Sequence, residues 1–103
     1  MDLIDLRGRI DAVDKQLIEL FCERMRLTAA AGVAKFKLGL PLNDDKRELE
    51  IRERIAGLAD KELAPYVNQF YQALFHLAKQ YQVLRPAMGK QPEITDEQIR
   101  NRS

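Results

Sequence analysis

The chain has 103 residues, of which 46% are hydrophobic and 32% are charged, and its formal net charge at pH 7 is +1. This composition is typical of one globular domain and excludes a disordered chain, and the near-neutral charge provides no overall field for nucleic acid or a membrane surface. The single cysteine, Cys22, excludes an internal disulfide and suits a reducing compartment. There is no signal-peptide pattern, and no apolar run reaches the roughly 18 residues of a membrane span. We therefore expect a cytoplasmic protein without a nucleic-acid or membrane partner.

The first stretch, from Asp2 to Leu38, has the apolar periodicity of one long helix. Asp2 is a suitable N-cap, and Gly39 followed by Pro41 supplies a stop. The apolar seam, with alternating steps of three and four except at one position, consists of Leu3, Leu6, Ile10, Val13, Leu17, Leu20, Leu27, Ala31, Ala34 and Leu38. Such a helix is about 55 Å long, whereas a compact chain of this size has a radius of gyration near ~13 Å. The helix therefore extends beyond its own domain, and we expect a homodimer in which a second copy covers the seam.

Arg24 occupies the one seam position that is not apolar. A charge directed into a buried seam is unfavourable unless a partner compensates it. Lys35 lies eleven residues later, which is close to three full turns, on the same face and about 16 Å further along the helix. The two cations predict a buried site for a small anion, with the alternative that both side chains reach water from the helix edge. Arg7 lies roughly 100° away around the helix, so it does not readily join such a site within its own chain. In an antiparallel dimer it could reach the site of the partner, although the sequence alone does not require this.

A second helix is predicted from about Asp44 to Ala59, with Asn43 as its N-cap. Glu48 stands at the head of the core stripe of this helix and is therefore a candidate site residue. Asp44 and Arg47, taken alone, are also explained as charged residues that form a local ion pair at a helix N-terminus. The whole inward stripe consists of Asp44, Glu48, Ile51, Ile55 and Leu58.

A third helix is predicted with Pro65 in its first turn and a stop near Arg85 and Pro86. Gln82 lies at the edge of its apolar stripe, where a solvated amide is the ordinary interpretation. The stripe consists of Val67, Phe70, Tyr71, Leu74, Leu77, Ala78, Tyr81 and Leu84. Residues 87–103 form a polar tail that is expected to be mobile, with a weak capping box at Thr95. We therefore expect an all-α chain with three helices, one domain over 1–86 and a tail over 87–103.

Several kinds of chemistry are not supported by the sequence. His76 has no second ligand at metal-binding spacing, and Cys22 has no histidine or aspartate arranged around it. There is no Gly-rich phosphate loop and no nucleophile elbow. We therefore expect no metal and no cofactor, and an enzyme of this kind would act by positioning and electrostatics.

Six segments resemble the all-helical (AroQ-class) chorismate mutases, a family that includes isochorismate-pyruvate lyases. These segments are Leu3–Arg7, Ile10–Asp14, Leu17–Leu20, Glu23–Arg24, Gly32–Lys35 and Pro41–Glu48. The resemblance covers about residues 3–85. It implies an intertwined homodimer of long helices with two equivalent active sites, each using one arginine of the other chain. It also implies a place in aromatic amino acid biosynthesis or in a secondary pathway.

The resemblance implies that four residues hold the carboxylates and the ether oxygen of the substrate. Arg24 would bind one carboxylate, and Arg7 of the partner subunit would bind the other. Lys35 would contact a carboxylate and the ether oxygen, and Gln82 would donate to the same oxygen. Because Gln82 is an amide rather than the glutamate of some relatives, we expect no sharply acidic pH optimum.

The resemblance also assigns residues to the ring of the substrate. Asp44 and Glu48 would face the ring hydroxyl, and Arg47 would contribute a backbone group or order the loop. Ala78 stands where well-studied members carry a serine that helps to hold a carboxylate, so one hydrogen bond is missing or is made by water. Lys35, Gln82, Arg24 and Glu48 are the predicted catalytic residues.

The expected reaction is the Claisen rearrangement of chorismate, a dicarboxylate, to prephenate. This reaction requires no nucleophile, only a chair-like substrate pose and donors at the oxygen where negative charge grows. Two alternatives on the same scaffold are an isochorismate-pyruvate lyase and a 4-amino-4-deoxychorismate mutase. A third is a non-catalytic helical dimerisation module in which Arg24 only sets the register.

Overall fold

The computed structural model describes residues 1–87, and within this range it contains three helices and no strand. These are α1 (Leu3–Lys37), α2 (Asp45–Leu58) and α3 (Ala64–Ala87). The predicted all-α fold is confirmed. Residues 88–103 of the predicted tail, with the capping box at Thr95, lie outside the described residues. No helix among the described residues is both long enough and apolar enough to span a membrane.

The limits of α1 follow from the capping residues that the sequence indicated. The Asp2 carboxylate accepts a hydrogen bond of 2.8 Å from the backbone N–H of Asp5. At the other end Gly39 has a positive φ of 69°, a conformation that favours glycine. The backbone N–H of Leu40 then bonds to the Lys35 carbonyl at 2.9 Å, and that of Gly39 to the Phe36 carbonyl at 3.1 Å. This Schellman motif ends the helix and turns the chain toward α2.

The predicted N-cap of α2 was wrong by one residue. Asp44, not Asn43, accepts the capping hydrogen bond from the backbone N–H of Arg47, at 3.1 Å. The Asn43 amide instead donates to the Asp45 carboxylate at 3.1 Å. Asparagine and aspartate are equally good caps, so adjacent candidates cannot be separated by propensity. α2 therefore begins at Asp45 and ends at Leu58, one residue inside each predicted limit.

α3 begins at Ala64 with Pro65 in its first turn, as predicted, and it continues to Ala87. This end lies one residue beyond Pro86, in agreement with the predicted stop near Arg85 and Pro86. A proline removes one backbone donor, and at the penultimate position this loss affects only the last turn.

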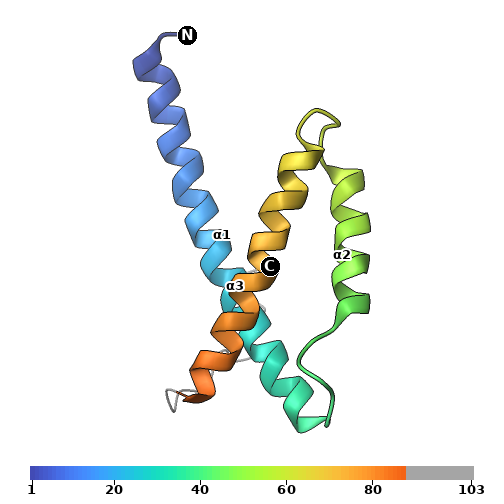
Figure 1. The fold of residues 1–103 in the computed structure, drawn as a ribbon. Coiled ribbons are helices and arrows are strands. Elements are labelled where there is room, and N and C mark those ends of the chain that lie inside the picture. Colours follow the sequence, from blue (N-terminus) through green and yellow to red (C-terminus); the bar gives the residue numbers. More distant parts are fainter. Residues whose placement is uncertain (88–103) are drawn as a thin grey trace.

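The core lies where α3 packs against both α1 and α2 (Figure 1). The predicted stripes were partly wrong about which side chains it contains. Leu58, Phe70 and Leu77 are exposed, whereas Phe75, which was not in the predicted stripe, is only 7% exposed. Because α3 contacts one helix on each side, its buried face is wider than a single stripe. The buried apolar residues are Ala29, Ile51, Leu74, Phe75 and Ala78.

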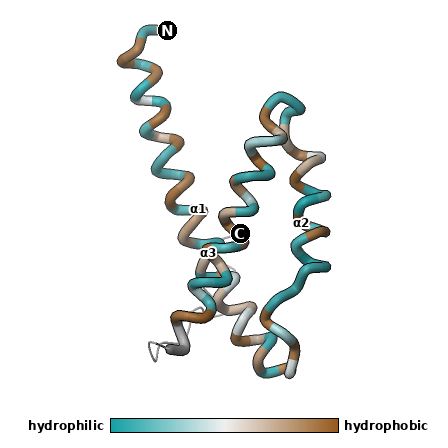
Figure 2. Tube along the Cα trace, viewed as in Figure 1, coloured by the Kyte–Doolittle hydropathy of each residue, from teal (hydrophilic) through white to brown (hydrophobic). Residues whose placement is uncertain are grey.

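The N-terminal half of α1 extends away from the other helices, as Figure 1 shows. Its seam is uncovered in the single chain, and Figure 2 shows hydrophobic residues along this whole segment. The longest dimension of the molecule is 53 Å and its radius of gyration is 16.4 Å. The expected overhang of α1 is therefore present. The exposed seam residues of this half are Leu3, Leu6, Ile10, Val13, Leu17 and Leu20.

Candidate active site

Arg24 lies on α1 where that helix faces α3. Its guanidinium carbon is 5.6 Å from the centroid of the Tyr71 ring and 5.8 Å from that of Phe75. One terminal nitrogen, Nη1, is buried and has no hydrogen-bond partner among the described residues. Burial lowers the pKa of Arg24, and the positive charges of Arg54 and Arg47 lower it further, against an opposing effect of Tyr71.

Among the described residues no carboxylate pairs with this partly buried guanidinium. The ion pairs found among the described residues join Arg47 to Glu50 and Lys79 to Glu48, and neither involves Arg24. Aromatic faces attract a cation, but they accept none of the strong hydrogen bonds that its N–H groups offer. A buried donor without a partner is unfavourable by about 1–3 kcal/mol. The site is therefore suited to a carboxylate, which accepts two parallel hydrogen bonds from a guanidinium.

Gln82 connects α3 to α1 one turn beyond Arg24. Its amide nitrogen donates a hydrogen bond of 2.5 Å to the backbone carbonyl of Thr28. The side chain lies against Gly32, where an added Cβ would be 3.2 Å from that nitrogen. Gln82 is half-buried, which excludes the solvated helix-edge alternative. Its second N–H remains available to a ligand, since a primary amide has two donors.

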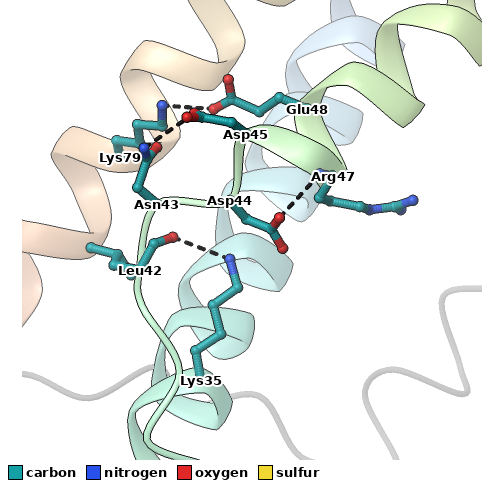
Figure 3. A network of polar contacts seen from close by, with 8 residues as sticks. All are labelled: Lys35, Leu42, Asn43, Asp44, Asp45, Arg47, Glu48 and Lys79. Carbon is teal, nitrogen blue, oxygen red and sulfur yellow. Dashed lines mark hydrogen bonds and ion pairs between the residues drawn. The ribbon is translucent and has the colours of Figure 1, made fainter.

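Lys35 lies at the C-terminal end of α1 and reaches the segment that leads into α2. Its ammonium group donates to the backbone carbonyl of Leu42 at 3.2 Å, and Figure 3 shows it directed toward the turn that contains Asp44. Lys35 is half-buried, and its hydrogen bond to Leu42 is itself exposed. The lysine and the cap of α2 therefore form one end of the candidate site.

Glu48 and Arg47 leave the first turn of α2 in different directions (Figure 3). Glu48 forms an ion pair of 2.7 Å with Lys79 of α3. Arg47 points away from Lys35 and Glu48, and its guanidinium lies 3.6 Å from the exposed Glu50 carboxylate. Within this chain Arg47 therefore contributes to the candidate site through its backbone N–H, which donates to the Asp44 carboxylate.

The structure groups most of the predicted residues but not all of them. Along α1, Arg24, Thr28 and Lys35 succeed one another, with Tyr71, Phe75 and Gln82 of α3 opposite the first two. Ala78, on the same helix, is buried and presents no polar side-chain group. Arg7 is exposed on the uncovered half of α1, about 25 Å along the helix from Arg24. A single chain therefore cannot bring Arg7 to the site.

Several residues of the site were missed by sequence reasoning. Phe75 and Lys79 occupy positions one turn apart on α3, and Lys79 precedes Gln82 by three residues, so the three share a face. That spacing was a usable signal for Lys79. Gly32, in contrast, was interpreted only as a weak point of α1. No group of three metal-ligating side chains occurs among the described residues, and His76 is exposed.

Comparisons with known proteins identify the family. The sequence model of the family described as chorismate mutase type II matches residues 6–83, which include all the predicted site residues. The chorismate mutase of Methanocaldococcus jannaschii is 38% identical over 56 residues, or 54% of this chain and 57% of that protein. The bifunctional chorismate mutase/prephenate dehydratase of Aquifex aeolicus is 38% identical over 80 residues, or 77% of this chain and 21% of that protein.

A third relative, the T-protein of Haemophilus influenzae, is 43% identical over 47 residues, or 46% of this chain and 12% of that protein. The chain thus spans between 12% and 57% of the length of these relatives. No solved structure gives a significant match. Because the family model covers well over half of the chain, the resemblance found in the sequence is confirmed, and the chain belongs to the chorismate mutase type II family.

Proposed function

We propose that this chain is a chorismate mutase, an isomerase that rearranges chorismate to prephenate without a cofactor. The observation that carries the proposal is the buried Nη1 of Arg24, which has no partner among the described residues. The substrate is a dianion, and one of its carboxylates supplies the missing acceptor. Membership in a family with relatives named chorismate mutase supports this substrate.

The rearrangement breaks the carbon–oxygen bond of the ether and forms a carbon–carbon bond within the same molecule. No proton is transferred, so the protein has to hold the folded substrate and stabilise the negative charge that grows on the ether oxygen. Arg24 fixes one carboxylate with its forked donors. Lys35 and the second N–H of Gln82 donate to the ether oxygen. Donors that are fixed before the reaction need no reorganisation during it.

Two acidic residues, Glu48 and the N-cap Asp44, face the ring in this proposal. Both are half-buried at the start of α2. Glu48 accepts the single hydrogen of the ring hydroxyl, and Asp44 faces the same hydroxyl without taking that hydrogen. Asp44 is already held by the backbone N–H of Arg47, which orients it. Ala78, 6% exposed, offers no hydroxyl to a carboxylate, so we expect water or nothing at that position.

The proposed enzyme is a homodimer, because the site is incomplete in one chain. The exposed seam of α1 supplies an apolar surface that a second copy can cover. In an antiparallel arrangement Arg7 of the partner subunit reaches the second carboxylate. We also place the protein in the cytoplasm, since its free Cys22 suits a reducing compartment.

The test is to follow the loss of chorismate absorbance with purified protein and to identify the product. Prephenate formation that collapses in Lys35→Ala supports the proposal. Pyruvate released from isochorismate, with no turnover of chorismate, overturns it in favour of the lyase. Turnover of aminodeoxychorismate alone replaces it with that mutase. If none of the three reacts and Arg24→Ala still binds a dicarboxylate transition-state mimic, the chain is a binding module.

A further inference from the structure

The ion pair between Lys79 and Glu48 is the contact that joins α3 to the acidic start of α2. The ammonium nitrogen of Lys79 lies 2.7 Å from Oε1 of Glu48, and the two side chains are 41% and 22% exposed. Figure 3 shows the pair beside the turn formed by Asn43 and Asp45. It therefore connects the two helices at the ring end of the proposed site.

The position of Lys79 in α3 ties this pair to the rest of the site. Phe75, one turn earlier, contacts the Arg24 guanidinium, and Gln82, three residues later, bonds to the Thr28 carbonyl. Residues at such spacings lie on one face of a helix. One face of α3 therefore carries three residues of the site in order. They are Phe75, which contacts Arg24, Lys79, which pairs with Glu48, and Gln82, the proposed donor to the ether oxygen.

The contact leaves half of the Glu48 carboxylate free. Lys79 approaches Oε1, and no hydrogen bond to Oε2 is formed by any residue that the structure describes. An ionised carboxylate accepts at both oxygens. A lysine on one oxygen thus leaves the other one oriented and able to accept from a hydroxyl.

The charge of Lys79 has a second consequence for a dianionic ligand. Glu48 and Asp44 add negative charge close to where the ring would lie, and like charges disfavour the binding of a dianion. A cation in contact with Glu48 compensates one of these charges without removing its ability to accept a hydrogen bond.

We propose that Lys79 is a positioning residue: it holds Glu48 by Oε1 so that Oε2 accepts from the ring hydroxyl of chorismate, and it compensates the charge of Glu48 beside the dianion. This inference rests on the proposed mutase function. Because the ring hydroxyl does not react, the interaction is equally strong in the ground state and the transition state. Lys79 therefore affects substrate binding more than the chemical step.

The experiment is a double-mutant cycle that combines Lys79→Met with Glu48→Gln. Methionine keeps the apolar stem of the lysine and removes its charge. In the wild-type background we expect Lys79→Met to raise KM about five- to tenfold, with kcat changed less than about twofold. In the Glu48→Gln background the same change should alter KM less than about twofold, because the group through which Lys79 acts is gone. Lys79→Arg should keep KM within about threefold of the wild type.

A matched control is Glu50→Gln, which breaks the exposed contact of 3.6 Å with Arg47. It removes an ion pair of α2 that points away from the site, and KM should stay unchanged. Thermal unfolding of every variant tests a purely structural role of the ion pair, which would lower the melting temperature of Lys79→Met in the wild-type background without raising KM.

Two results overturn the inference. One is an unchanged KM in Lys79→Met, and the other is an equal rise in KM in both Glu48 backgrounds. In either case an active wild type leaves the mutase function standing. A wild type that forms no prephenate from chorismate removes the proposed function and this inference with it.

Discussion

Gln82 of α3 crosses onto α1 directly over Gly32, where an added Cβ would lie 3.2 Å from its amide nitrogen and 3.4 Å from Cγ and Cδ. A glycine inside a helix is less favourable than alanine by about 1 kcal/mol. Here the missing side chain makes room for the amide that bonds to the Thr28 carbonyl. Gly32 therefore sets the distance at which a proposed catalytic donor is held.

Gly32→Ala should lower the activity of the enzyme while leaving its stability nearly unchanged. The substitution gains helix propensity of about 1 kcal/mol and pushes the Gln82 amide back, which weakens a hydrogen bond worth a similar amount. We expect the free energy of unfolding to change by less than about 1 kcal/mol, while kcat/KM falls about tenfold or more. Urea unfolding and chorismate turnover measure the two effects.

Gly57→Ala is the matched control, because an added Cβ at Gly57 meets no atom within 4 Å. It should stabilise α2 by up to about 1 kcal/mol and leave turnover unchanged. Full activity in Gly32→Ala would show that the close approach of Gln82 has no catalytic importance.

The parts of the fold set by local chemistry were predictable. Asp2 and Gly39 act within their own turns, so the limits of α1 were predicted to within one residue. Arg24 was found because it is the single cation in an apolar seam. Asn43 and Asp44 could not be separated as caps, because both residue types satisfy the same N–H groups.

What the sequence could not reveal depends on contacts between distant residues. Lys79 and Glu48 are paired only because α2 and α3 lie side by side. Phe75 is buried because α3 contacts a helix on each side. The apolar periodicity of α3 alone does not reveal that there are two such contacts.

Arg24→Met should make the ligand-free protein at least as stable as the wild type. The substitution replaces a partly buried guanidinium, whose buried Nη1 has no partner among the described residues, with an apolar side chain beside two rings, and burial has already lowered the pKa of Arg24. We expect an unchanged or higher melting temperature without ligand. We also expect a loss of at least about a hundredfold in kcat/KM.

Binding of a dicarboxylate transition-state mimic gives the matching test. At about one hundred times its Kd the mimic should stabilise the wild type by about 2.7 kcal/mol, and this gain should disappear in Arg24→Met. A variant that is less stable but fully active would mean that Arg24 only sets the register of the helices.

Leu17→Glu should dissociate the proposed dimer. Leu17 is 46% exposed in the single chain, so a charge there has little effect on one protomer, but it would be buried in a covered seam. Sedimentation should show a shift toward monomer and a loss of turnover. Gln16→Glu, which adds the same charge outside the seam, should leave the dimer intact. A Leu17→Glu protein that remains dimeric would place the interface elsewhere.

Arg7→Ala and Arg24→Ala should each abolish turnover, and a mixture of the two should recover part of it. Arg7 lies about 25 Å along α1 from Arg24, so an active site that contains both must take one from each chain.

In a heterodimer of the two variants one site has both arginines and the other has neither. After random exchange of subunits half of the dimers are of this kind, so activity should return to roughly a quarter of the wild-type value. Turnover measured before and after co-refolding gives the result. If activity does not return although heterodimers form, Arg7 does not complete the site of the other subunit.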